Sequence, residues 1–66
     1  MMKEILSLRD HRENKGLSKR QLAKLSGIPY TSYLRIEGKV ENASIDRLRA
    51  ICHVLDISLD EIFFGE

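Results

Sequence analysis

Apolar residues recur at intervals of three and four along the chain, and no stretch alternates apolar and polar residues over the length of a strand. This spacing is typical of amphipathic helices that bury one face, so the sequence predicts an all-α fold. Capping residues and glycines divide the pattern into segments, and we expect a compact bundle of five short helices. The expected helices lie near residues 4–14, 19–26, 29–37, 45–55 and 59–63.

Residues suited to helix ends mark several of these boundaries. Ser18 and Gln21 form a capping-box pattern, in which the two side chains satisfy backbone N–H groups of the first turn. Ser58 and Glu61 repeat the pattern near the end of the chain. Pro29 suits a first helical turn, because its ring fixes φ and it has no N–H to leave unpaired. The other boundary signals are Ser44 as a cap and Gly16 and Gly38 as helix stops.

Two of the expected helices have a clear inner face. In the first, Ile5, Leu8 and positions 11–12 fall on one side at helical spacing, which predicts that they pack inward. In the helix after Ser44, the expected inner residues are Ile45, Leu48, Ile51, Cys52 and Leu55. Both faces are expected to join a single core, because the chain has no repeats and no linker.

The 66 residues fit one small domain, which we place at residues 4–63, and we expect no further domain that would sense a small molecule. Positive charge is concentrated in the first part of the chain. Residues 1–39 carry nine Lys/Arg and four Asp/Glu, whereas residues 40–66 carry two and six. Unless this clustering is random, a basic front and an acidic back indicate a polyanionic partner on one side of the molecule.

Composition argues against several other classes of protein. The longest apolar runs are three residues, too short to span a membrane, and Lys3 and Glu4 interrupt the N-terminal apolar residues. We therefore expect a cytoplasmic protein without a leader. The single cysteine excludes an internal disulfide, and Cys52 and His53 would point about 100° apart on a helix, which argues against a shared metal ion. No nucleophile–base spacing stands out, so we expect neither an enzyme nor a cofactor.

Residues 18–37 have the pattern of two helices joined by a tight turn. Such a pair needs a small residue where the helices approach most closely, which Ala23 provides. It also needs a turn residue that accepts a positive φ, which Gly27 provides. The expected apolar residues beneath the pair are Leu22, Ile28 and Ile36.

This stretch resembles the helix-turn-helix of the Cro and phage-repressor type (xenobiotic-response-element-like) DNA-binding domains. The likeness extends from about residue 8 to residue 63. The residues that carry it, at the family's spacing and without a gap, are Arg12, Lys15, Gly16, Leu17, Ser18, Leu22, Ala23, Gly27, Ile36, Glu37, Asn42, Ser44, Leu55, Ser58, Leu59, Asp60 and Glu61. The resemblance implies a lambda-repressor-like fold whose helix-turn-helix is formed by the second and third helices.

In that family the second helix of the motif enters the DNA major groove and reads base edges. Carried over by position, the implied base contacts are Tyr30, Thr31, Leu34 and Arg35. Arg35 is the most specific of them, because a guanidinium can donate two parallel hydrogen bonds to guanine O6 and N7. Leu34 either touches a thymine methyl group or is an incidental exposed leucine.

The start of the motif's first helix is expected to bind the phosphate backbone. Backbone N–H groups and the positive end of the helix dipole favour an anion there, and Lys19 adds a charge. Arg20 either contributes in the same way or lies on a solvated face. The full set of expected phosphate contacts is Ser18, Lys19, Arg20, Ser32 and Lys39.

The resemblance also implies a structural, largely buried ion pair between Arg12 and Glu37, which would join the first and third helices. Other positions depart from the family pattern, and two of these departures concern the recognition helix itself. The departures are His11, Tyr33 and Cys52 in the expected core, Pro29 in place of a Ser or Thr cap, and Gly38, which comes one residue early.

The apolar end of the chain carries both phenylalanines. Some of its residues must close the core, and the others are expected to form a two-fold dimer contact, as is common for domains of this family. A dimer would place two recognition helices about 34–36 Å apart and imply a palindromic site. Alternatively, the segment folds wholly onto its own core. The candidate interface residues are Leu59, Ile62, Phe63 and Phe64.

The favoured function is therefore a sequence-specific regulator of transcription that binds double-stranded DNA, with repression as the expected mode. The alternative is a protein-interaction module that uses the same helical fold. Such a module would bind a toxin–antitoxin or transcription-machinery partner through the end at Phe63 and Phe64. The charge asymmetry and the polar residues at Tyr30, Thr31 and Arg35 favour DNA.

Overall fold

The computed structural model describes residues 5–64, which contain four α-helices and two single-turn 3-10 helices. In order, they are α1 (Leu8–Asn14), α2 (Lys19–Ser26), α3 (Tyr30–Gly38), η1 (Val40–Asn42), α4 (Ile45–Leu55) and η2 (Leu59–Glu61). The prediction of an all-α fold is confirmed for these residues. The predicted count of five helices becomes four α-helices, because the last predicted helix is a 3-10 turn, and the start of the first helix also needs correction.

The first helix begins later than the sequence pattern predicted. Ser7 caps α1, because its hydroxyl accepts a hydrogen bond from the Asp10 N–H at 3.2 Å. Leu6 lies before this cap and forms an isolated parallel β-bridge with Ile62. Ile5 was expected on the inner face, but it is 60% exposed because it precedes the helix. Of the predicted range 4–14, residue 4 lies outside the described residues.

The last predicted helix, 59–63, is reduced to the single turn of η2. It stops because Phe63 donates its N–H to the Leu6 carbonyl at 2.8 Å, and Leu6 donates its own N–H to the Glu61 carbonyl at 3.1 Å. The Ser58–Glu61 pattern still operates, since the Ser58 N–H donates to Glu61 Oε2 at 2.7 Å. Contacts between the two ends of the chain therefore replace the final helical turn.

The turn between α2 and α3 follows the sequence prediction closely. Ser18 and Gln21 form the expected capping box, with N···O distances of 3.0 and 2.7 Å. Gly27 ends α2 at φ 70°, a left-handed conformation that favours glycine. Pro29 precedes the first helical residue of α3 instead of belonging to it. Gly38 was expected to stop α3, but it is the last helical residue and has no positive φ.

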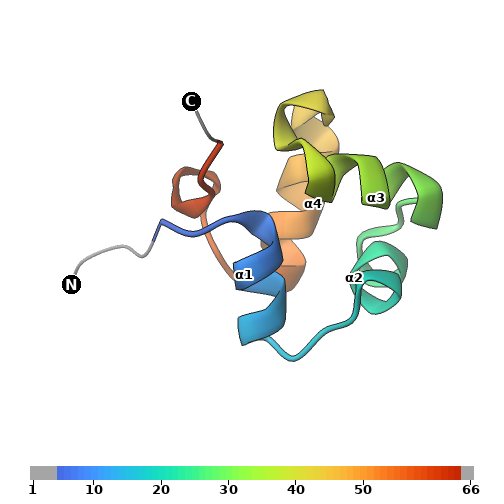
Figure 1. Cartoon of the computed structure of the whole chain (residues 1–66), viewed down its shortest axis with the longest axis horizontal. Coiled ribbons are helices and arrows are strands. Elements are labelled where there is room, and N and C mark those ends of the chain that lie inside the picture. Colours follow the sequence, from blue (N-terminus) through green and yellow to red (C-terminus); the bar gives the residue numbers. More distant parts are fainter. Residues whose placement is uncertain (1–4, 65–66) are drawn as a thin grey trace.

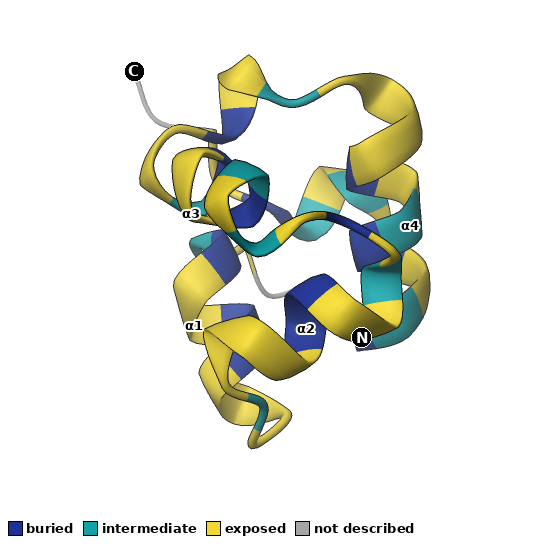
Figure 2. Ribbon diagram, turned by 90° about the vertical axis from the view of Figure 1, so that its right-hand side faces the viewer, coloured by how far each residue is buried: buried dark blue, intermediate teal, exposed yellow. Residues whose placement is uncertain are grey.

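A single core fills the space between the helices, with α2 packed against both α3 and α4 (Figure 1). Figure 2 shows the buried positions of α1, α2 and α4 turned toward the centre of the molecule. Ile45 was expected among them but is 47% exposed, because it is the first residue of α4 and lies beyond the packed part of the helix. The buried apolar residues are Leu8, Leu22, Ala23, Ile28, Tyr33, Ile36, Val40, Leu48, Ile51, Cys52, Leu55 and Ile62.

The helix-turn-helix lies apart from the joined chain ends, by which we mean residues 5–7 and the segment 59–64 that pairs with them. In Figure 1 the segment before α1 and the turn η2 lie at the left, whereas α2 and the start of α3 lie at the right. The molecule measures 34 Å along this axis. Within residues 5–64, every helix is too short or too polar to span a bilayer. One face of the molecule can thus contact a ligand at α3 while the opposite end remains accessible.

Candidate nucleic-acid interface

An ion pair ties α3 to α1. Arg12 donates to Glu37 Oε1 through Nη2 at 3.0 Å and through Nε at 3.1 Å, and both side chains are less than one-tenth exposed. Arg12 Nη1 also donates to the Leu17 carbonyl at 2.8 Å. Burial alone would lower the pKa of Arg12, but its hydrogen bond and attraction to Glu37 outweigh burial and raise it. This pair connects α1, α3 and the loop before α2.

With one side of α3 held against the core, the other side faces solvent. Tyr33 and Ile36 are buried, whereas Thr31, Leu34 and Arg35 are exposed. This division follows the helical repeat, because positions three and four apart share a face. Three of the four expected base contacts therefore lie on the outer face of α3, and one of them, Leu34, is 37% exposed.

The Arg35 guanidinium is not paired with a carboxylate in the part of the chain that the structure describes. The neighbouring Glu37 points inward to Arg12 and leaves the outer face without that negative charge. Arg35 therefore keeps all its donors for an external acceptor, which is what bidentate recognition of a base or phosphate requires.

Tyr30, the fourth expected base contact, is stacked against Arg20. The Arg20 guanidinium carbon lies 4.1 Å from the centroid of the Tyr30 ring, a cation–π contact between α2 and α3. Tyr30 is half-buried and packs against the core, so only part of the side chain can meet a ligand. Arg20, an expected phosphate contact, is thus positioned beside an expected base contact.

The first turn of α2 provides backbone donors for an anion. The capping box uses the N–H groups of Ser18 and Gln21, which leaves those of Lys19 and Arg20 without an intrahelical partner. The side chains of both residues are exposed. A phosphate at this position would meet two backbone N–H groups, two cations and the positive end of the helix.

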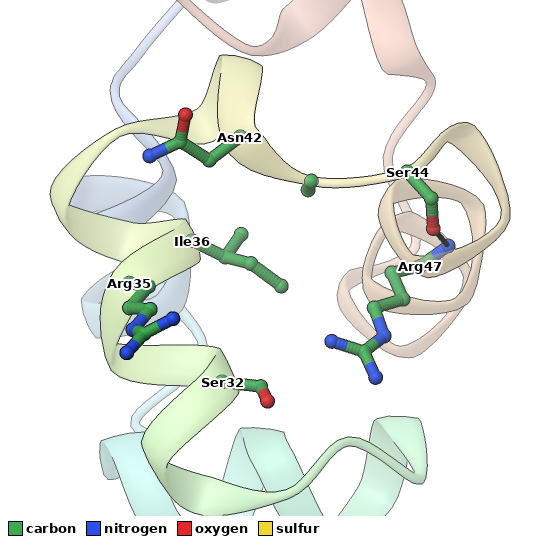
Figure 3. A pocket seen from close by; sticks show the side chains of 7 residues that line it. Ser32, Arg35, Ile36, Asn42, Ser44 and Arg47 are labelled. Carbon is green, nitrogen blue, oxygen red and sulfur yellow. Dashed lines mark hydrogen bonds between the residues drawn. The ribbon is translucent and has the colours of Figure 1, made fainter.

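A pocket of about 290 Å³ beside α3 brings in residues that the sequence analysis did not assign to the site. Arg47 extends from α4 into the space between α3 and α4 (Figure 3). Ser44 lies beside it and caps α4 by accepting a hydrogen bond from the Arg47 N–H at 3.2 Å. The residues that line the pocket are Ser32, Arg35, Ile36, Asn42, Ala43, Ser44 and Arg47.

This pocket combines a helix N-terminus with two arginines, which suits a phosphate group. The sequence did contain a signal for it, since Ser44 marked a helix start and Arg47 stands in the first turn. Arg47 lies in the acidic part of the chain, so the distribution of charge along the sequence did not mark it as a phosphate ligand. Ser32, expected to contact phosphate, is one of the lining residues.

Lys39, the remaining expected phosphate contact, is exposed just beyond α3. A helix of this length spans about 13 Å, so Lys39 and Tyr30 lie near opposite ends of it. The cations at the two ends of α3 could therefore bind phosphates on either side of a groove.

The joined chain ends divide the four candidate dimer residues into two groups. Ile62 is only 2% exposed and belongs to the core, so its side chain is not part of any docking surface. Leu59 is half-buried against the core. Phe63 and Phe64 are 52% and 40% exposed, and together with Ile5 they leave an apolar surface at this end.

The other unusual residues serve the structure. His11 is buried, and its Nε2 lies 2.7 Å from the Glu61 carbonyl oxygen, which attaches η2 to α1. Burial and the nearby Glu61 raise the pKa of the Cys52 thiol. His53, the next residue on α4, is exposed. Within residues 5–64, no three His, Cys, Asp or Glu side chains come together in a way that could hold a metal ion.

Comparison with known proteins agrees with this geometry. The helix-turn-helix family model matches residues 8–62, which covers every helix described above. Comparison with curated proteins and with solved structures gives no significant match. The matched family consists of DNA-binding domains of transcription regulators. The chain belongs to the Cro/C1-type, XRE-like helix-turn-helix family.

Proposed function

We propose that this protein is a sequence-specific regulator of transcription that inserts α3 into the major groove of double-stranded DNA. The observation that carries the proposal is the orientation of α3. Its inner face is fixed by the core and by the ion pair to Arg12, while Thr31 and Arg35 face outward. Base reading needs donors and apolar groups held on a rigid element, and this helix supplies both.

Positive side chains on both sides of α3 support binding to the DNA backbone. Lys19 and Arg20 lie at the start of α2, Lys39 follows α3, and Arg47 lines the neighbouring pocket. Each phosphate neutralised by such a cation releases a counterion, so the logarithm of the affinity should fall by about 0.9 for each tenfold rise in salt and each contact.

We further propose that the protein acts as a homodimer on a palindromic operator. Phe63 and Phe64 supply an apolar surface at the end of the molecule away from the start of α3. A two-fold contact there would leave both recognition helices free, about 34–36 Å apart on adjacent major grooves. Repression is the mode we propose, because occupying an operator requires no further activity.

Selection of tight binders from a pool of random duplexes tests this function. We expect a two-fold symmetric consensus, and binding of a selected duplex that weakens steeply as salt is raised from 50 to 200 mM, by about 10³-fold or more for six phosphate contacts. Failure to enrich any duplex at low salt would overturn the proposal. The protein-interaction function would then be favoured, with the exposed phenylalanines as its binding surface.

A further inference from the structure

Tyr33 carries a polar group into the core on the inner face of α3. Its side chain is 0% exposed. Buried tyrosine hydroxyls are normally hydrogen-bonded, because an unpaired buried polar group is costly. Within the described residues the Tyr33 hydroxyl oxygen has no partner that meets hydrogen-bond geometry, and the same is true of the buried Glu37 Oε2.

These two oxygens are suited to each other. Tyr33 and Glu37 are four residues apart in α3, so their side chains leave the same face of the helix. Both hydrogen bonds that Arg12 donates to Glu37 go to Oε1, which leaves Oε2 without a donor. An ionised carboxylate can only accept and a phenol can donate, so a small adjustment of the two side chains pairs them.

The protonation state of Tyr33 supports this pairing. Burial raises the pKa of its phenol far above the ordinary value, and the adjacent Glu37 carboxylate raises it further. The phenol therefore keeps its proton throughout the physiological range and remains a donor.

We propose that Tyr33 is a positioning residue for DNA recognition. Its hydroxyl donates to Glu37 Oε2 and completes a buried Arg12–Glu37–Tyr33 network that fixes the rotation of α3 against α1. The consequence for DNA rests on the proposed function, whereas the network itself does not. Rotation about the axis of α3 would move Thr31 and Arg35 together relative to the groove, so the network controls where these side chains point.

Removal of the hydroxyl tests the network without DNA. Tyr33→Phe keeps the ring and should lower the equilibrium constant for folding about tenfold, since a hydrogen bond to a charged group is lost. The same substitution in a Glu37→Gln background should have a clearly smaller effect, because a charge-assisted bond is about twice as strong as a neutral one. Tyr30→Phe is the matched control and should leave the denaturation midpoint unchanged. Equal effects of Tyr33→Phe in both backgrounds, or none, would overturn the network.

A second measurement tests positioning. The dissociation constants of Tyr33→Phe are compared for a duplex selected by the wild-type protein and for a scrambled duplex of equal length, at a temperature where the variant is fully folded. We expect the dissociation constant for the scrambled duplex, divided by that for the selected duplex, to fall several-fold toward one, the value for non-specific binding. A merely structural role would leave this ratio unchanged and would overturn the positioning role. If the wild-type protein binds no duplex, the proposed function and this role fall together, while the stability measurements still decide the network.

Discussion

The guanidinium carbon of Arg20 lies 4.1 Å above the centre of the Tyr30 ring and joins the first helix of the motif to the start of the second. Through this contact a residue expected to bind phosphate supports a residue expected to read a base. The stack adds to the packing of Tyr30 against the core and so limits the rotation of its half-buried side chain. We therefore expect affinity and specificity to be physically connected at this point of the surface.

This connection predicts that substitutions at Arg20 and Tyr30 are not additive. In a double-mutant cycle with Arg20→Gln and Tyr30→Ala, the binding energies to a selected duplex should show a coupling of about 0.5–1 kcal/mol. Lys24 is exposed on α2 and provides the control, since Lys24→Gln and Tyr30→Ala should be additive. Fluorescence anisotropy at fixed salt gives all the affinities. A coupling near zero for Arg20 would show that the stack does not contribute to binding.

Lys19 and Arg35 should affect DNA binding in different ways. Lys19→Ala should weaken binding to every duplex and reduce the salt slope by about one, because it removes a phosphate contact. Arg35→Ala should instead relax the preference at one base position, at a cost of about 1–3 kcal/mol for the preferred base. Binding is measured against selected, singly substituted and random duplexes. If the two variants behave alike on all three, the assigned roles are wrong.

The buried pair of Arg12 and Glu37 should be important for stability. Glu37→Ala removes the buried partner of Arg12 and leaves only the half-exposed Glu13 carboxylate, 3.8 Å from Arg12 Nη2, so we expect a cost of about 3–5 kcal/mol. For a domain of this size, such a loss lowers the Tm by more than about 10 °C. Arg9→Ala breaks the exposed pair with Glu13 and is the control, with an expected loss of about 0.5 kcal/mol at most. Thermal unfolding by circular dichroism compares them, and similar Tm values would contradict the structural role.

Gly27 and Gly38 should respond oppositely to alanine. Gly27 has a φ of 70°, so Gly27→Ala is expected to cost about 1–2 kcal/mol despite the open space around it. Gly38 is helical and a Cβ there would meet nothing within 4 Å, so Gly38→Ala should add about 0.5–1 kcal/mol. Chemical denaturation measures both changes. A destabilised Gly38→Ala variant would indicate that α3 ends differently in solution.

The apolar chain end predicts separate effects on assembly and on folding. Replacing both Phe63 and Phe64 by aspartate should raise the dimer dissociation constant at least tenfold and leave the monomer folded, since both side chains are exposed. Ile62→Ala should act on the monomer instead and cost about 2–5 kcal/mol through a core cavity. Sedimentation equilibrium and thermal unfolding distinguish the two effects. An unchanged dimer in the aspartate variant would place the interface elsewhere.

The elements that the sequence alone determined are those whose causes lie within a few residues. The Ser18–Gln21 capping box, the left-handed turn at Gly27 and the inward face formed by Leu48, Ile51 and Leu55 depend on neighbours at most four positions apart. For this reason Thr31, Leu34 and Arg35 are exposed as expected, whereas α3 begins and ends one residue later than predicted.

Tertiary structure decided the features that depend on partners distant in the sequence. Leu6 pairs with the segment after Glu61 instead of extending α1, because those backbone groups meet only when the chain has closed. The pocket that joins Arg35 to Arg47 likewise exists only once α4 packs beside α3. Helical periodicity gives the direction of a side chain relative to its own helix, but only packing against other helices determines which neighbour that side chain meets.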